Sequence, residues 1–229
     1  MVSEKRKILH GIRNSLTQDP FGVQFLWPWF RSLLPGHSPV LDGLPWMNFR
    51  AIRWLKSYLK PDMGAFEYGA GGSTIFVARR VKSLVSIEHD PDWYELVSRA
   101  LRERGISNCD LRLVPAEPRP STKSVGYGPT SYTSRNPSAE GYSFEAYVRT
   151  IDAWPDRSLD FVIVDGYARF SSVARAIPKV KPGGYLLFDD SDLRKYREAV
   201  AFLDEFPRTD FVGVTPFHWM LRQTSIWQM

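Results

Sequence analysis

The sequence predicts an α/β domain: a mostly parallel β-sheet that finishes in an antiparallel strand pair and carries helices on both faces. From about residue 63 onward, short apolar runs alternate with helical patterns, which is typical of parallel strands joined by crossover helices. Near the end of the chain, strand-like segments at 211–216 and 225–227 lie close enough in sequence to pair through a turn. The two observations together predict a mixed sheet.

The run at 159–165 is the clearest strand, because it is nearly all apolar, as expected of a central strand buried on both faces. The other parallel strands are expected at 65–68, 83–87, 111–114 and, after a turn at 181–184, at 185–188. Helices are expected at 73–81, 92–105, 171–179 and 194–205.

The chain divides into a mostly helical N-terminal cap, residues 1–60, and a main domain, residues 61–229. Residues 115–147 interrupt the domain with a segment rich in Pro, Ser, Thr, Gly and Tyr. A loop this long in a compact domain is usually functional or disordered, and its tyrosines favour a lid or substrate loop. The apolar stretch 25–34 is interpreted as a helix or turn packed on the domain; membrane-surface contact or a homo-oligomer interface stays open.

Composition narrows the classes of function. A single cysteine, Cys109, rules out an internal disulfide and favours a reducing compartment, so a cytoplasmic location is expected. Neither a secretory signal nor an apolar run long enough to span a membrane is expected. The net charge of +5 comes from scattered basic residues, whereas nucleic-acid binders usually cluster them. A small-molecule acceptor or substrate is therefore favoured over a nucleic acid.

In an open α/β sheet, ligands bind beyond the carboxyl ends of the strands, so the residues that follow each strand matter most. After the first strand, Gly69 and Gly71 allow a tight turn and close approach to a ligand, and Ser73 or Thr74 is positioned to cap the next helix. A carboxylate as near as Glu67 would disfavour a pyrophosphate and favour a cationic amino-acid ligand. Four of five such strand ends carry acids.

The order of these motifs resembles that of class I S-adenosylmethionine-dependent methyltransferases, and it comes closest to bacterial small-molecule O-methyltransferases. The resemblance covers residues 63–227 and rests on four segments: Glu67-x-Gly69-x-Gly71-x-Ser73, Ser86-Ile87-Glu88-His89-Asp90, Val164-Asp165-Gly166 and Lys181-Pro182-Gly183-Gly184. It implies a Rossmann-like, seven-stranded sheet and S-adenosylmethionine as cofactor. The residues that it implies for the cofactor site are Glu67, Gly69, Gly71, Ser73, Glu88, His89, Ala116, Glu117 and Asp165, with Glu88 on the ribose and Ala116 and Glu117 near the adenine.

For the reaction, Asp165 is the candidate general base, since it follows the central strand close to where the methyl group would point. Asp165, Asp189 and Asp190 also form an acidic trio at one rim, and such carboxylates repel one another unless a positive group lies between them. All-oxygen sites of this kind suit Mg²⁺, and catechol-type O-methyltransferases have metal-binding acids after the same two strands. The sequence leaves open both a divalent metal and a metal-free site.

The expected reaction is methylation of a hydroxyl on a small molecule or sugar. Two alternatives remain: an NAD(P)-dependent oxidoreductase, and an inactive methyltransferase fold that serves as a binding protein. The oxidoreductase fingerprint requires a small residue where this chain has Thr74. Base amino groups are disfavoured as acceptors, because such enzymes usually place Pro-Pro and an aromatic after the fourth strand, where this chain has Gly166-Tyr167-Ala168. His218 and His89 are weaker candidates for the site, and Arg169 is a candidate either to bind an acidic group of the acceptor or to form a surface salt bridge.

Overall fold

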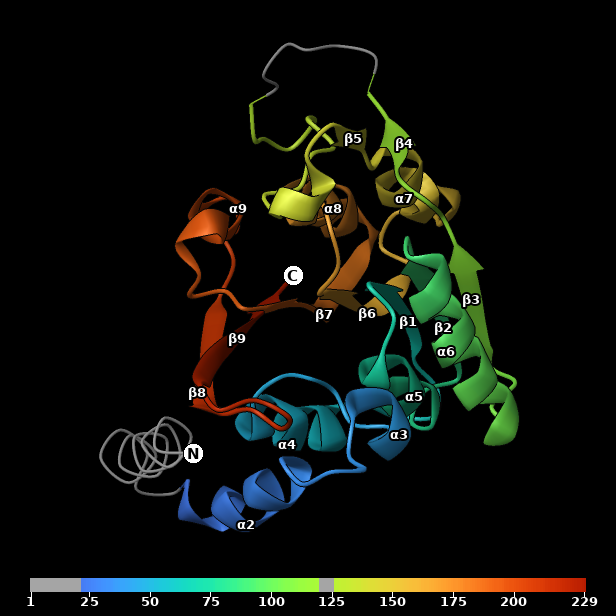
Figure 1. The fold of residues 1–229 in the computed structure, drawn as a ribbon. Coiled ribbons are helices and arrows are strands. Elements are labelled where there is room, and N and C mark those ends of the chain that lie inside the picture. The colour runs from blue at the N-terminus through green and yellow to red at the C-terminus, as the bar shows by residue number, and fades with distance from the viewer. Residues whose placement is uncertain (1–21, 120–125) are drawn as a thin grey trace.

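A computed structural model describes residues 22–119 and 126–229 (Figure 1). Its central sheet has seven strands in the order β3-β2-β1-β6-β7-β9-β8, which confirms the predicted fold class. The strands are β1 (Gly64–Tyr68), β2 (Ser83–Glu88), β3 (Cys109–Leu113), β6 (Leu159–Val164), β7 (Val180–Asp189), β8 (Arg208–Val214) and β9 (Leu221–Gln228).

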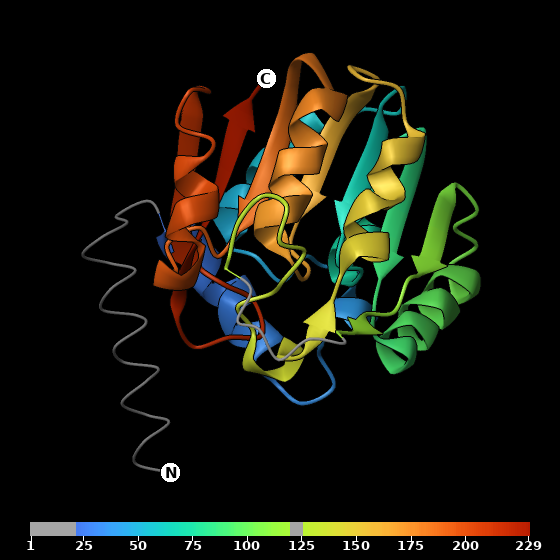
Figure 2. The same cartoon turned by 90° about the horizontal axis from the view of Figure 1, so that it is seen from above.

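Parallel pairing joins β1 to β2 and β6, β2 to β3, and β6 to β7, so the carboxyl ends of these strands meet at one edge (Figure 2). β9 lies antiparallel between β7 and β8, as predicted for the last two strands. The predicted turn at 181–184 is wrong: these residues belong to β7. Residues 181–184 form a bulge in β7, where the register with β6 shifts, and the strand continues beyond the bulge.

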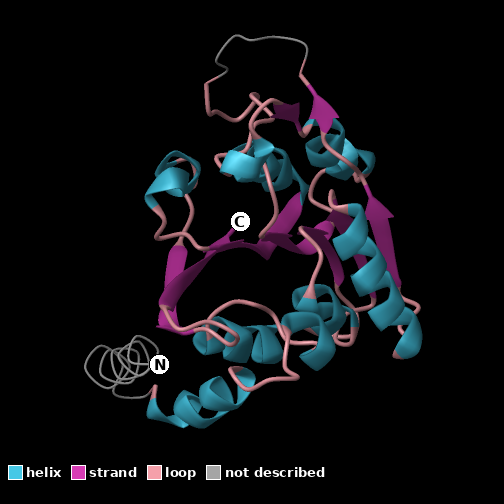
Figure 3. Ribbon diagram, in the orientation of Figure 1, coloured by secondary structure: helices cyan, strands magenta, loops and turns pink. Residues whose placement is uncertain are grey.

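Two layers of helices cover the sheet (Figure 3). Successive side chains of a strand point to opposite faces, so Phe66 and Tyr68 join one core while Ala65 joins the other. The first face is covered by α7 (Glu145–Arg149), α8 (Arg169–Ala176) and α9 (Arg197–Ala201). The second is covered by α2 (Val23–Ser32), α3 (Pro39–Asp42), α4 (Phe49–Tyr58), α5 (Gly72–Ala78) and α6 (Pro91–Glu103).

The helices are shorter than predicted. The segment expected to be helical at 171–179 begins at Arg169 and ends in a 3-10 turn, Ile177–Lys179. The segment expected at 194–205 is a 3-10 turn, Arg194–Tyr196, followed by α9. In α6, Asp90 caps the N-terminus by accepting a hydrogen bond from the Trp93 N–H, which turns the chain away from the end of β2.

Within 115–147, the described residues carry short elements of their own. β4 (Glu117–Pro118) pairs antiparallel with β5 (Tyr142–Ser143), and a 3-10 turn lies at Pro137–Ala139. Phe144 and Tyr147 are fully buried in the core above β1 and β6. This part of the segment is therefore packed on the domain, while residues 120–125 lie outside the described chain.

In the N-terminal segment, the described residues from 22 onward form helices that share a core with the sheet. Trp29, Met47 and Leu55 pack with Phe161 and Leu187 of the strands. Within residues 22–119 and 126–229, no helix has the length and apolar character needed to cross a membrane. The predictions for residues 1–21 fall outside the described chain.

A candidate active-site cleft

A cleft of about 540 Å³ opens beyond the carboxyl ends of β1, β2, β6 and β7. Its volume falls in the range usual for small-molecule sites. At one end lie Gly69, Ala70, Glu88, His89, Asp90 and Trp93; at the other lie Trp46, Asp189, Asp190, Thr215, His218 and Arg222, with Asp165, Gly166, Tyr167 and Arg169 between them. The cleft thus brings together the ends of four strands and two remote segments.

The floor of the cleft is the crossing of two loops. Gly69 has φ +93°, a conformation that favours glycine, and a Cβ there would lie 2.6 Å from the Gly166 Cα atom. A Cβ atom at Gly166 would overlap the Tyr147 hydroxyl, which occupies that space. The loop after β1 can therefore touch the loop after β6 only because both positions are glycine. Gly71, which the sequence assigned to the cofactor site, follows directly but is not among the cleft-lining residues.

Glu67 and Ser73 lie beneath the glycine loop and do not line the cleft. Glu67 is fully buried, and its Oε2 atom accepts hydrogen bonds from the hydroxyls of Thr74 (2.5 Å) and Ser86 (2.6 Å). Thr74 Oγ1 also accepts from the Gly71 N–H at 2.8 Å. The acid that the sequence placed beside the ligand instead supports the loop from below.

Burial raises the pKa of Glu67 from 4.5 to about 7, against the hydrogen bonds that favour the carboxylate. The folded chain then holds a proton that the unfolded chain has lost, so this acid makes the free energy of unfolding fall between about pH 4.5 and 7. Glu67→Gln, which removes the titration, is expected to gain stability relative to the wild type by about 3 kcal/mol from pH 4.5 to 8.

Urea unfolding at a series of pH values measures this difference. The exposed Glu117→Gln serves as the matched control and should show no comparable trend. A Glu67→Gln stability difference that stays constant with pH would show that the buried carboxyl does not titrate in this range.

Glu88, at the end of β2, is 4% exposed and lines the cleft. Its Oε1 atom accepts from the backbone N–H groups of His89 (2.7 Å) and Asp90 (2.9 Å), and the His89 Nδ1 atom lies 2.7 Å away. Among the described residues, its Oε2 atom accepts one hydrogen bond, from the Ala70 N–H at 3.1 Å. The carboxylate is held rigidly by one oxygen and retains acceptor capacity on the other.

Aromatic side chains flank Glu88. The Trp93 indole N–H donates to the Ala70 carbonyl at 2.6 Å, which fixes the ring beside the glycine loop. The His89 ring lies 4.0 Å from the Tyr167 ring, centroid to centroid. Ala116 and Glu117, predicted near an adenine, are not among the lining residues; Ala116 packs against the core and Glu117 is exposed in β4.

Asp165 follows β6, and its carboxyl group faces the middle of the cleft with the side chain 23% exposed. Arg169, one turn further on, donates from Nη2 to Asp165 Oδ1 at 2.9 Å and to the Asp165 carbonyl at 2.7 Å. Burial raises the pKa of Asp165 to about 6; Arg169 opposes the rise and Asp190 adds to it. Asp165 is thus largely ionised at neutral pH, yet basic enough to accept a proton.

The side chains of Asp165, Asp189 and Asp190 are not arranged as a three-ligand group in this structure. Within the part of the chain that the structure describes, no group of three His, Cys, Asp or Glu side chains has an arrangement that could hold a metal ion. Asp189 accepts a 2.5 Å hydrogen bond from the Thr224 hydroxyl inside the sheet. The buried Arg169 guanidinium bridges the carbonyls of Asp165, Gly166 and Asp189. A positive charge beside the trio is therefore supplied by Arg169, and the Mg²⁺ ligand set of Asp165, Asp189 and Asp190 stays a prediction that this arrangement does not support.

At the far end of the cleft, the sequence had indicated Asp189, Asp190 and, more weakly, His218, but not Trp46, Thr215 or Arg222. Trp46 comes from the segment before α4, and Thr215, His218 and Arg222 come from the turn and strand after β8. They reach the cleft because β9 runs antiparallel beside β7, which brings the β8–β9 turn over the sheet edge. No local sequence pattern predicts this placement. Trp93, in contrast, follows the Asp90 cap by three residues, a signal that the sequence did contain.

No protein-family model matches the chain, and no curated protein matches it. Solved structures do. A candidate O-methyltransferase from Klebsiella pneumoniae is 14% identical, with a TM-score of 0.54 over 97% of this chain and 95% of that one. A candidate methyltransferase from Streptococcus mutans, in complex with S-adenosylhomocysteine (SAH), is 12% identical, with a TM-score of 0.53 over 79% and 96%.

An rRNA methylase from Streptococcus thermophilus is 15% identical, with a TM-score of 0.51 over 79% of this chain and 95% of that one. At these identities the likeness establishes the fold and not the acceptor. Proteins that share one fold can differ widely in what they modify. This chain has the fold of class I S-adenosylmethionine-dependent methyltransferases.

Proposed function

We propose that the protein is an S-adenosylmethionine-dependent methyltransferase that methylates a hydroxyl group of a small molecule or sugar. The observation that carries the proposal is Glu88, a rigidly held carboxylate with a remaining acceptor oxygen at the end of β2. A carboxylate at that position can accept hydrogen bonds from the hydroxyls of a ribose. The crossing of Gly69 and Gly166 leaves the neighbouring floor free of side chains.

Charge supports this cofactor over a dinucleotide. Five carboxylates and only two guanidinium groups line the cleft, so its formal charge is negative although the chain as a whole is basic. A sulfonium and an ammonium group are attracted by such a lining, whereas a pyrophosphate is repelled. The donor set therefore fits S-adenosylmethionine, with Glu88 on the ribose and Gly69 and Ala70 beside the methionine part.

When bound, S-adenosylmethionine supplies an electrophilic methyl group. The task left to this chain is to hold the acceptor oxygen in line and to remove its proton. Asp165 is the base in this proposal, because its carboxyl group faces the cleft and Arg169 fixes its orientation at 2.9 Å. Arg169 also neutralises part of the acidic lining, so the chemistry of the donor set favours a base without a metal ion.

Binding of SAH distinguishes the proposal from the oxidoreductase alternative. SAH is expected to raise the Tm, since a ligand at 100 times its Kd adds about 2.7 kcal/mol of stability, while NADH is expected to leave it unchanged. The exposed variant Glu117→Gln should respond like the wild type, and Glu88→Gln should respond more weakly. Stabilisation by NADH and not by SAH would overturn the proposal.

A further inference from the structure

We propose that the far end of the cleft binds a neutral sugar ring of the acceptor, stacked on Trp46 and hydrogen-bonded by Thr215, His218, Asp190 and Arg222. The inference rests on the proposed function, because it assigns the acceptor class of the same cleft. These residues lie on the side away from Glu88 and Trp93, beyond Asp165. An acceptor held there faces the proposed base.

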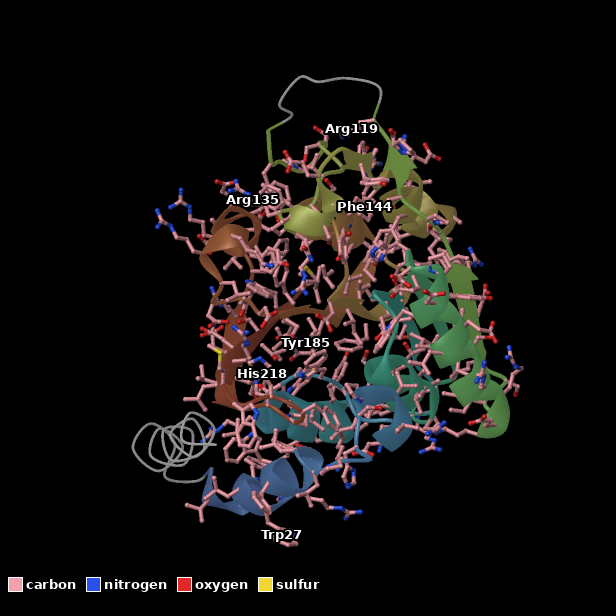
Figure 4. The ribbon with its side chains drawn as sticks, viewed as in Figure 1. Trp27, Arg119, Arg135, Phe144, Tyr185 and His218 are labelled. Carbon is pink, nitrogen blue, oxygen red and sulfur yellow. The ribbon has the colours of Figure 1, made fainter. Side chains whose placement is uncertain are left out.

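Trp46 supplies an apolar platform. Its side chain is 49% exposed although it lines the cleft, and its ring lies 6.4 Å from that of His218, centroid to centroid. Figure 4 shows His218 near the turn between β8 and β9, with the helices of the N-terminal segment beneath it. The negative face of an indole attracts positively polarised C–H groups, which a sugar ring presents on its apolar side.

Thr215 has a hydroxyl that needs a partner. The residue is 2% exposed and lines the cleft, yet its Oγ1 atom has no hydrogen-bond partner among the described residues. A buried hydroxyl without a partner is costly, and such groups in folded proteins are almost always satisfied by protein, water or ligand. A hydroxyl of the acceptor would satisfy it.

His218 is a hydrogen-bond donor at this end of the cleft. Its Nδ1 atom accepts the Met220 N–H at 3.1 Å, so the proton of the neutral ring is on Nε2. Burial, together with Arg222, lowers the pKa of His218, which keeps the ring neutral at physiological pH. His218 therefore binds an acceptor oxygen and does not compete with Asp165 for its proton.

At the far end Asp190 and Arg222 offset each other's charge, and burial raises the pKa of the other carboxyl group there, Asp189, well above its usual value, which favours its neutral form. Asp190, held at φ +56° in the turn after β7, has its Oδ1 atom 3.5 Å from the Arg222 Nε atom. Both side chains remain about one quarter exposed, at 25% and 24%, so each keeps hydrogen-bonding capacity. Because Arg222 is already paired with Asp190, an anionic acceptor gains little from it; because Asp190 is paired with Arg222 in turn, a cationic amine gains little from Asp190.

The number of polar groups distinguishes a sugar from a phenol. Four polar side chains, those of Thr215, His218, Asp190 and Arg222, line the cleft together with Trp46, and a phenol with one or two hydroxyls would leave some of them without a partner when it displaces water. Unpaired polar groups in a site are the usual basis for rejecting a ligand. A sugar ring carries several hydroxyls that each donate and accept, so it can satisfy the whole set.

Calorimetric titration of methyl glycosides of glucose, galactose, mannose and rhamnose tests the inference. At least one glycoside is expected to bind the SAH-loaded protein, and phenol and catechol are expected to bind more weakly. Trp46→Ala should weaken glycoside binding by about 3- to 10-fold. Thr215→Val, which keeps the side-chain shape, should weaken it by about 2- to 10-fold.

Trp27→Ala is the matched control, because Trp27 is 72% exposed and points away from the body of the protein (Figure 4). It should leave glycoside binding unchanged. The sugar subsite is refuted if no glycoside binds, if phenols bind more tightly, or if Trp46→Ala binds glycosides like the wild type. Titrations are run with and without SAH, so failure to bind SAH contradicts the proposed function separately.

Discussion

Asp165→Asn is expected to lower turnover by about 10²- to 10⁴-fold, the usual contribution of a general base. The amide keeps the shape of the side chain and one oxygen for Arg169, so the fold and the affinity for SAH should stay close to those of the wild type. A methylation assay with the identified acceptor measures turnover, and calorimetry measures SAH binding. Asp156→Asn, an exposed position, provides the control and should retain activity.

The pH profile gives a second readout for Asp165. Burial raises its pKa to about 6, and only the ionised carboxylate can accept a proton, so wild-type turnover should fall as the pH drops below about 6. The residual activity of Asp165→Asn should lack this step. Since Arg169 supplies the positive charge, EDTA should leave wild-type turnover unchanged. Full activity of Asp165→Asn would show that Asp165 is not the general base.

Gly72→Ala is expected to destabilise the fold by about 1–3 kcal/mol or more, as overpacking of a rigid site does. A Cβ atom at Gly72 would overlap the carbonyl oxygens of Pro39 and Leu44. These are backbone atoms of the α3 region and cannot move aside like the end of a flexible side chain. Thermal or urea unfolding measures the loss, and SAH binding should weaken with it because the displaced residue adjoins the glycine loop.

Gly71→Ala is the neighbouring control. A Cβ there would make ordinary contacts at 3.9 Å with Ser73 and Trp93, and its extended φ of 175° suits any residue. Its stability should remain within about 0.5 kcal/mol of the wild type. Equal destabilisation by both variants would mean that loop entropy, and not the contact with the N-terminal segment, makes Gly72 necessary.

The sequence predicted the strands well because those of the parallel core are short apolar runs, and the seven-stranded sheet followed from the family resemblance. The run at 159–165 and the terminal pair were recognised for this reason. The prediction of a turn at 181–184 failed because Pro-Gly-Gly normally ends a strand, whereas here pairing with β6 at Val180 and again from Tyr185 onward carries β7 through a bulge. Tertiary pairing outweighed local preference.

For the site, the sequence placed acids at the correct strand ends but could not give their directions. Strand alternation turns Glu67 towards α5, so it supports the loop, while Glu88 faces the cleft. The acidic trio suggested a metal because the partner of these acids, Arg169, lies on the next helix and becomes buried only through packing. The far end depends on the β8–β9 turn, which no local motif specifies.

The Arg169 side chain bridges the ends of β6 and β7. It ties the carbonyls of Asp165, Gly166 and Asp189 into one fixed unit. Trp46 and Thr215, in contrast, come from segments outside that unit. Under the proposed function, acceptor preference can therefore diverge among descendants by substitution at Trp46 and Thr215, without change at Asp165 or Arg169. Directed evolution aimed at a new acceptor should accumulate its successful changes there.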